Sequence, residues 1–228
     1  MLADQLKSVV LENVARVKVL KDFGIEYSSD RDKTLEEIAD SKGLDLYALV
    51  RELSEASDFK QLKKSDFKHW TQILIIEDIL LPDHNSLREA KEYFLEKGDT
   101  LFRDYRKKTP KMLELRDLLR NMMEDIATHI DREENTLFPA IKHIEYKGKD
   151  NVLMDSSLFS SVITLIQNHE HSNNDVELIQ KSINQILITS NLNTEIEDFC
   201  MEVRGLCNTI KKHIFVEDEV LFKMVVEM

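Results

Sequence analysis

The stretch HIDREENTLFPAI, residues 129–141, decides the fold because its pattern recurs as HIFVEDEVLF at residues 213–222. Both copies read His-Ile-x-x-Glu-x-x-x-Leu-Phe. Residues four apart project from the same face of a helix, so each copy presents an imidazole and a carboxylate side by side. The repeat therefore predicts two helices that each carry a pair of metal-binding side chains. These pairs are His129 with Glu133 and His213 with Glu217.

Apolar residues continue the same helical face on the N-terminal side of each copy. Stepping back from each histidine by three or four residues meets only large apolar side chains, and such a stripe is typical of a helix face that packs into a core. We therefore expect each His-Glu pair to point into the interior. The stripes are Leu115, Leu119, Met122 and Ile126 before His129, and Phe199, Val203, Leu206 and Ile210 before His213.

Each half of the chain also carries one histidine upstream of its repeat. His84 precedes His129 by 45 residues, and His169 precedes His213 by 44. Each half therefore predicts two helices joined as a hairpin, and two hairpins predict an all-α, four-helix bundle with the histidines facing its centre. We choose His169 over His171 because only His169 lies on the apolar stripe of its helix. The histidines expected at the surface are His69, His143 and His171.

The converging side chains are candidate metal ligands. Without a metal, several buried imidazoles and carboxylates would lack partners at a cost of about a few kcal/mol each. Six ligands exceed what one zinc ion takes, and two bridging carboxylates with two imidazoles on each ion suit a non-haem di-iron centre, with zinc or manganese left open. Such a centre has room for a bridging oxygen and for O2, NO or peroxide. We predict terminal ligands His84, His129, His169 and His213, and bridging ligands Glu133 and Glu217.

The composition is that of an ordinary globular protein and excludes some partners. The chain has 228 residues, of which 42% are apolar and 32% charged, and its 31 basic and 43 acidic residues give a net charge of -12. Nucleic acids and anionic membranes bind basic patches, so neither is an expected partner. Association into a homodimer stays open.

Cysteine usage favours a reducing compartment. Cys200 and Cys207 would lie about 10 Å apart on one helix, too far for a disulfide, so we expect reduced buried thiols. The first residues lack the apolar run of a signal peptide, and no stretch has the roughly 18 consecutive apolar residues of a membrane span. A cytoplasmic location is expected.

Three segments are expected along the chain. Residues 1–58 predict a small helical domain with one helix at about 4–21, and with Thr34 and Glu37 as the capping box of another. Residues 59–68 predict a linker, and residues 69–228 the bundle. The first bundle helix is expected at 69–97 with Gly98 as its stop. Pro82 either kinks this helix or begins a new one, and both interpretations stay open.

The motifs resemble the hemerythrin-like di-iron proteins that repair iron centres, the RIC or ScdA type. That family has a His on the first bundle helix, H...EE..LFP on the second, a His followed by small residues on the third, and H...E...LF on the fourth. The matching segments are LPDHNSLRE at 81–89, HIDREENTLFP at 129–139, NHEHSNN at 168–174 and HIFVEDEVLF at 213–222. The resemblance extends over nearly the whole chain, because residues 13–46 are similar to the family's N-terminal domain.

Two positions depart from the family. Its N-terminal domain carries Cys-Cys-Gly-Gly after Gly-Ile-Asp-Tyr, whereas here Ser28 and Ser29 replace the two cysteines. Any function that needs those thiols for redox chemistry or metal transfer is therefore in question. Some members also have a histidine between the first two bundle helices, where this chain has Tyr105. Tyr105 is interpreted as a residue that contacts the ligands or lines a channel, and not as a ligand.

The resemblance implies a response to nitrosative or oxidative stress, in which a di-iron centre binds NO or O2 and helps to repair damaged iron-sulfur clusters. Three alternatives stay open. The chain could be an O2 or NO sensor or carrier without repair activity, a redox enzyme that reduces NO or peroxide, or a bundle that has lost its metal. Whether it is an enzyme is therefore left open.

Overall fold

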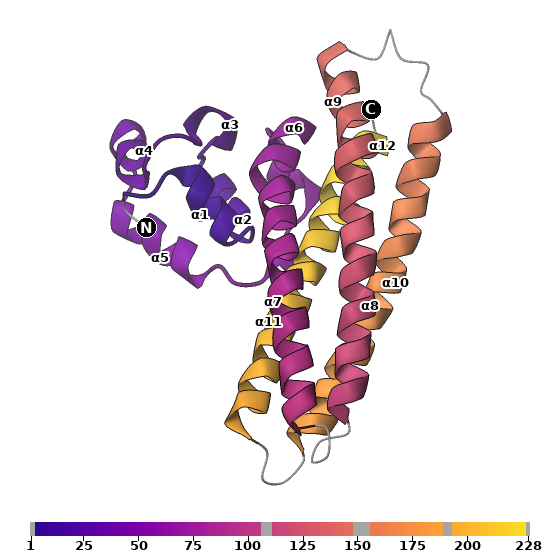
Figure 1. Ribbon diagram of the computed structural model, residues 1–228. Coiled ribbons are helices and arrows are strands. Elements are labelled where there is room, and N and C mark those ends of the chain that lie inside the picture. Colours follow the sequence, from indigo (N-terminus) through magenta and orange to yellow (C-terminus); the bar gives the residue numbers. More distant parts are fainter. Residues whose placement is uncertain (1–2, 106–110, 148–155, 189–192, 227–228) are drawn as a thin grey trace. The chain divides into compact units, whose positions relative to one another are not determined.

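The computed structural model describes residues 3–105, 111–147, 156–188 and 193–226. Within these ranges every secondary-structure element is a helix (Figure 1). The only β-type pairing among the described residues is an isolated bridge between Gln5 and Thr34. The predicted all-α class is therefore confirmed. No helix of the described residues is both long and apolar enough to cross a membrane. The chain divides into two compact units, one made of Met1–Pro82, Ile144–Lys149 and Phe215–Met228, the other of Asp83–His143 and Asp150–Ile214.

The first unit begins with short helices. The prediction of a single helix at 4–21 is wrong, because the helix is interrupted at Asn13, whose backbone is extended. The Asn13 side chain holds the break by donating to the Ala56 carbonyl at 2.5 Å and accepting from the Ala15 N–H at 3.0 Å. The predicted capping box of Thr34 and Glu37 is confirmed. The elements are α1 (Leu6–Glu12), α2 (Arg16–Asp22), α3 (Tyr27–Asp30), α4 (Leu35–Lys42), α5 (Leu46–Glu55), η1 (Phe59–Gln61), η2 (Lys64–Phe67), α6 (Gln72–Ile75) and η3 (Ile76–Leu80).

Aromatic side chains join these short helices. The Tyr27 ring stacks on Trp70 with centroids 3.8 Å apart. The Tyr27 hydroxyl donates to Asp78 at 2.9 Å, and Arg31 forms an ion pair with the same carboxylate. These contacts connect α3 to η3, which leads into the first long helix. The described residues from 3 to 82 thus all belong to the first compact unit.

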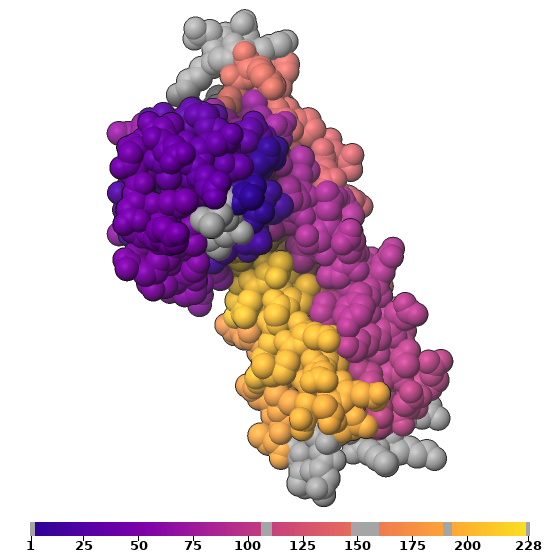
Figure 2. Space-filling model, turned by 90° about the vertical axis from the view of Figure 1, so that its left-hand side faces the viewer, coloured from indigo at the N-terminus to yellow at the C-terminus, as the bar shows by residue number. Residues whose placement is uncertain are grey.

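Four long helices form the bundle (Figure 1). They are α7 (Leu81–Tyr105), α8 (Lys111–Arg132), α10 (Ser156–Leu187) and α11 (Thr194–Val216). Helix α8 continues through η4 (Glu133–Leu137) into α9 (Phe138–Lys147), and α11 continues through η6 (Glu217–Leu221) into α12 (Phe222–Val226). Figure 2 shows the surfaces of α7 and α11 side by side. The Lys97 ammonium and the Tyr93 hydroxyl of α7 both donate hydrogen bonds to the Glu202 carboxylate of α11.

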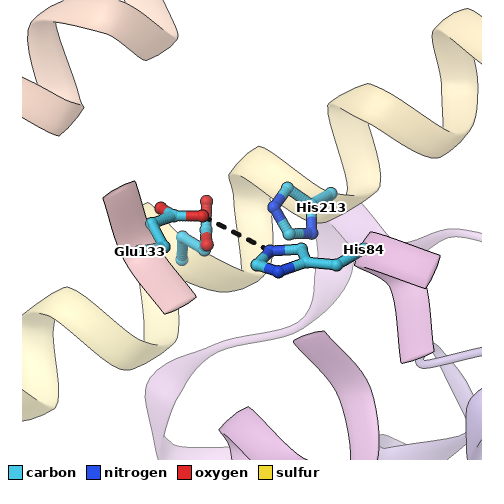
Figure 3. A group of neighbouring side chains, drawn as sticks. His84, Glu133 and His213 are labelled. Atoms are coloured by element: carbon cyan, nitrogen blue, oxygen red, sulfur yellow. Dashed lines mark ion pairs between the residues drawn. The ribbon is translucent and has the colours of Figure 1, made fainter. Parts of the chain in front are cut away.

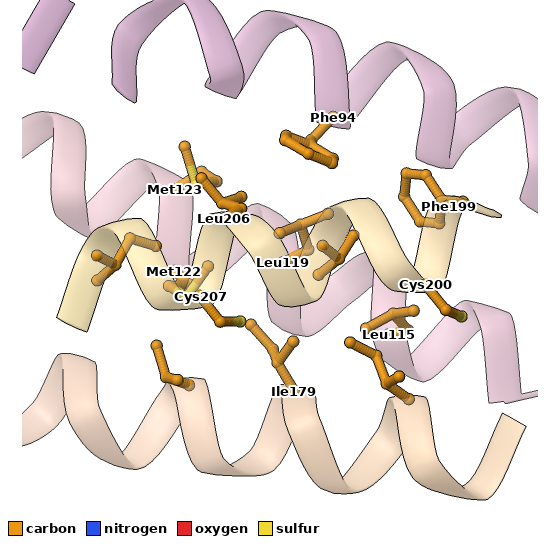
Figure 4. Packing of buried hydrophobic residues seen from close by; sticks show 14 of the residues in the cluster. Phe94, Leu115, Leu119, Met122, Met123, Ile179, Phe199, Cys200, Leu206 and Cys207 are labelled. Atoms are coloured by element: carbon orange, nitrogen blue, oxygen red, sulfur yellow. The ribbon is translucent and has the colours of Figure 1, made fainter. Parts of the chain in front are cut away.

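The bundle core is built from the predicted apolar stripes. Leu115 and Leu119 on α8 pack with Phe199 and Leu206 on α11 and with Ile179 on α10 (Figure 4). All of these side chains are buried. Because the stripes continue directly into the histidine positions, the packing that holds the helices together also fixes which way the histidines face.

Gly98 does not end the first bundle helix, contrary to the prediction. Helix α7 runs past it to Tyr105. A side chain at Gly98 would place its Cβ only 3.3 Å from the buried Phe199 ring, so the glycine allows α7 and α11 to pack closely. Pro82 also lies within continuous helix, since α6, η3 and α7 follow one another without a break. The interpretation that a new helix begins at Pro82 is therefore wrong.

A wide turn precedes Pro82. The segment η3 is π-helical, and the Leu81 N–H that closes it donates to the Ile76 carbonyl, five residues back. Proline inside an α-helix removes a hydrogen bond and crowds the carbonyl four residues earlier. A π-helical turn changes the hydrogen-bond register just ahead of the ring, so the helix can continue to His84, two residues further on.

Candidate metal centre

The structure brings all six predicted ligands together. One comes from each of α7 and α10, two from the run of α8 and η4, and two from the run of α11 and η6. Five of them are buried, with His84, Glu133 and Glu217 fully so, and the His129 side chain is 11% exposed.

Two groups of four potential ligand atoms form within this cluster. His84, His213 and both glutamates make one group, in which all the atoms lie within 4.8 Å of one another. His129, His169 and the same two glutamates make the second. Glu133 and Glu217 are thus shared, with a pair of imidazoles on either side. This is the arrangement that two bridging carboxylates and two metal ions require.

The carboxylate of Glu133 faces one imidazole from each group. Its Oε2 lies 3.3 Å from His84 Nε2 (Figure 3), and its Oε1 lies 2.9 Å from His129 Nε2. The His129 and His169 Nε2 atoms lie 3.0 Å from each other. Although the imidazole nitrogens are close, neither Glu133 oxygen accepts a hydrogen bond. A fully buried carboxylate in this condition is costly unless a cation satisfies it, so the residues fit a non-haem metal centre.

Each glutamate ligand candidate begins a π-helical turn. Glu133 is the first residue of η4, and Glu217 is the first residue of η6. In both segments the closing N–H donates to the glutamate carbonyl five residues earlier. Isolated π-turns within α-helices are rare and frequently lie at functional sites. The two sequence repeats therefore share a backbone irregularity as well as their side chains.

A carboxylate orients the His84 ring from outside the cluster. Glu134 Oε1 lies 2.9 Å from His84 Nδ1, which leaves Nε2 directed at Glu133. Arg88 donates to both oxygens of Glu134, each at 2.9 Å, and this ion pair lowers the pKa of the Glu134 carboxyl, with burial opposing it. Phe138 stacks on a face of the His84 ring with centroids 5.4 Å apart. The ring is thus fixed both in its plane and in its tautomer.

The environment of His213 is different. Its Nδ1 lies 4.0 Å from Asp83 Oδ2, beyond hydrogen-bonding distance. Asp83 instead accepts a 2.8 Å hydrogen bond from Lys212. Both Asp83 and His213 are buried. The two imidazoles of this group therefore differ in how strongly a neighbouring carboxylate holds them.

The remaining polar candidates lie elsewhere. Tyr105 donates to Glu195 at 2.8 Å and accepts from Asn193, at the far end of α7. At 1.5 Å rise per residue this end is about 32 Å from His84 along the helix, so Tyr105 neither contacts the ligands nor lines a channel beside them. The prediction that the other three histidines lie at the surface is confirmed, since His69, His143 and His171 are exposed.

Sequence reasoning did not identify the groups around the cluster. Glu134 directly follows a predicted ligand, and Arg88 lies four residues after another, so helical spacing could have indicated both. Asp83 and Lys212 are each adjacent to a predicted ligand in the sequence. Their pairing across two helices has no sequence signal. The π-turns were not predicted either.

Comparisons with known proteins identify the family. The iron-sulfur cluster repair protein YtfE of Enterobacter sp. (strain 638) is 23% identical over 220 residues, which cover 96% of this chain and 95% of that protein. The proteins of the same name from Escherichia coli O17:K52:H18 (strain UMN026 / ExPEC) and Escherichia fergusonii are 22% identical with the same coverage. The model of the hemerythrin HHE cation binding domain matches residues 76–225, more than half of the chain. The match extends through the helices that carry the cluster of histidines and glutamates, and the chain belongs to the hemerythrin HHE cation-binding family.

Proposed function

We propose that this chain holds two iron ions and uses them in a nitrosative or oxidative stress response that assists the repair of damaged iron-sulfur clusters. The observation that carries the proposal is the sharing of Glu133 and Glu217 between two groups of imidazoles. The fully buried Glu133 carboxylate, which accepts no hydrogen bond, supports it. The assignment of iron, in preference to zinc or manganese, rests on the family and on the names of the relatives.

Each of the two groups of residues would bind one iron ion. His84 and His213 would be terminal ligands of one ion, His129 and His169 of the other, and the two glutamates would bridge them. A bound iron pair supplies an open position for a small diatomic ligand, NO or O2, together with one-electron chemistry. The apolar stripes on either side exclude water, and Glu134 with Arg88 fixes the direction of the His84 ring.

The repair role comes from the relatives and fits the length of the match. The similar proteins are named iron-sulfur cluster repair proteins, and the alignment includes the N-terminal helices as well as the bundle. We extend that role to this chain as a proposal, together with a cytoplasmic location and with iron-sulfur proteins as partners.

A sensor or carrier of O2 or NO without repair activity is the second candidate. It is favoured by Ser28 and Ser29, which lie exposed on α3 where the resembling family has its cysteine pair. The two cysteines of the chain, Cys200 and Cys207, are buried in the bundle core and do not replace those thiols at the surface. Thiol-dependent metal transfer from the N-terminal unit is therefore not open to this chain.

The test of the centre is metal content with visible absorption. Protein purified without oxygen should contain about two irons per chain and should change its visible spectrum on exposure to air and to NO. Glu133→Ala and Glu217→Ala should each lose metal and the spectral response. Glu219→Ala is the matched control, because Glu219 is an exposed carboxylate in the same π-turn as Glu217. Retention of both irons with an unchanged spectrum in either ligand variant would refute the assignment.

The test of repair uses the same preparations. A purified iron-sulfur enzyme damaged by NO is incubated with the iron-loaded protein and assayed for recovery of activity. Recovery with wild type and with Glu219→Ala, but not with Glu133→Ala, is the expected result. Reversible gas binding without any recovery would support the sensor or carrier.

A further inference from the structure

A second group of potential ligands lies on the outer side of α8 and α10. Asp125 comes from α8, and His171 and Asp175 come from α10. The potential ligand atoms of the three residues lie within 4.8 Å of one another. Two of the residues are exposed and Asp175 is half-buried. This outer triad shares no residue with the buried cluster.

The pattern within the outer triad resembles that of the two buried pairs. His171 and Asp175 read His-x-x-x-Asp, so an imidazole and a carboxylate again project from one face of a helix. The third ligand comes from the neighbouring helix, because α8 and α10 pack side by side (Figure 1). Each group thus combines an i, i+4 pair with a side chain from the facing helix. Unlike the buried groups, the outer triad is open to solvent on one side.

The distances fit a bridging cation better than direct hydrogen bonds. His171 Nε2 lies 3.6 Å from Asp175 Oδ2 and 3.9 Å from Asp125 Oδ2. Hydrogen bonds between such groups are about 2.7–3.2 Å long. Two ligands of one tetrahedral ion with bonds of about 2.1 Å are roughly 3.4 Å apart. A small rotation of exposed side chains would therefore complete a three-ligand site, with water in the remaining position.

The charges of the outer triad favour a cation. With His171 neutral the group carries two negative charges, and in the described part of the chain neither carboxylate forms an ion pair with a lysine or arginine. Burial raises the pKa of Asp175, His171 opposes that rise, and the charge of Asp125 adds to it. One exposed imidazole does not compensate both carboxylates. A divalent cation would neutralise them and use all three donors.

We propose that Asp125, His171 and Asp175 form a surface site for a divalent transition-metal cation, separate from the buried cluster. One imidazole nitrogen and two carboxylate oxygens are a donor set that Zn2+ accepts, with water as the fourth ligand. The site binds its cation independently of whether the buried cluster holds iron.

The test counts Zn2+ bound to the full-length protein by equilibrium dialysis and calorimetry. Wild type with its buried cluster filled by iron should bind one further Zn2+, and His171→Ala and Asp125→Asn should each abolish that binding. His143→Ala is the matched control, since it removes another exposed histidine and should leave the count unchanged. Zn2+ should also protect His171, but not His143, from chemical modification of its imidazole.

A background variant separates this proposal from the iron-based function. In Glu133→Ala protein the buried groups lack their shared carboxylate, yet Zn2+ binding that depends on His171 should remain. Zn2+ binding by the Glu133→Ala protein that depends on His171 would support the surface site even if the protein never holds two irons. Equal Zn2+ binding by wild type, His171→Ala and Asp125→Asn would overturn the proposal and leave the three residues as a surface ion pair only.

Discussion

Removing Glu134 should weaken metal binding although Glu134 is not a predicted ligand. In Glu134→Ala the His84 ring loses the acceptor that lies 2.9 Å from its Nδ1. The ring is then free to rotate or to change tautomer, so its Nε2 no longer points permanently at the shared Glu133. Arg88 also loses its two hydrogen bonds to Glu134 and keeps only the exposed contact with Asp131.

The expected loss follows from the contacts that disappear. Groups that orient a metal-binding histidine typically contribute about 10- to 100-fold in affinity, which corresponds to about 1.4–2.7 kcal/mol. Glu134 is partly exposed and is already paired with Arg88, so we expect a value near the lower end of that range. Glu134→Gln should lie between wild type and Glu134→Ala, because its amide oxygen can still accept from Nδ1. The assay is competition with a chelator of known affinity, read out as metal retained per chain.

Asp131→Asn is the control for the loss of charge. Asp131 contacts Arg88 at 3.2 Å from the same helical run, whereas the carboxylate at His84 Nδ1 is that of Glu134. Its substitution should leave the metal affinity within about twofold of wild type, as expected for an exposed ion pair. If Glu134→Ala and Asp131→Asn lost metal equally, or if neither did, the orienting role of Glu134 would be wrong.

Two further predictions concern the titratable groups away from the cluster. Burial opposes ionisation of Asp30, but hydrogen bonds from Lys33 and Lys42 outweigh it and hold the pKa of this carboxyl below its ordinary value of 3.8. The ionised Asp30 therefore stabilises the fold fully above about pH 3.8, and this contribution to the free energy of unfolding is lost as the pH falls through the lower pKa of the folded state. Asp30→Asn should flatten the acid side of a plot of unfolding free energy against pH. An unchanged slope would contradict this prediction. Burial raises the pKa of both the Cys200 and the Cys207 thiol to about 11. At pH 8 roughly one such thiol in a thousand is ionised, so a disulfide reagent should titrate both thiols rapidly only after denaturation, and rapid reaction of the native protein would show that the core opens.

The bundle and its inward histidines were predictable because their signals are periodic. A large apolar side chain at every third or fourth position indicates which face of a helix is buried, and the spacing of the duplicated His-x-x-x-Glu places its polar residues on that face. The choice of His169 over His171 rested on this register, and the structure places the first inside and the second outside. This periodicity can be recognised within one helix, without knowledge of the helices that pack against it.

Features that depend on contacts between distant segments were not predictable. Gly98 reads as a helix stop in isolation, and only the proximity of Phe199 shows that its missing side chain is needed for packing. The break at Asn13 likewise depends on the Ala56 carbonyl, 43 residues away. Local propensity is a weak prior, and tertiary contacts overrode it at both positions.

The π-turns also bear on a detail of the repeat, the burial of its last two residues. In an α-helix successive residues point about 100° apart, so two consecutive side chains both face the core only where the apolar face is wide, as at Met122 and Met123 in α8. Leu137 and Phe138 are likewise both buried, as are Leu221 and Phe222. A π-turn has more residues per turn than an α-helix, so the angle between successive side chains is smaller and both residues can turn inward. Each copy of Glu-x-x-x-Leu-Phe in the repeat thus coincides with a widened turn in this chain. The same residue that supplies a shared carboxylate begins the turn that closes the apolar core beside it.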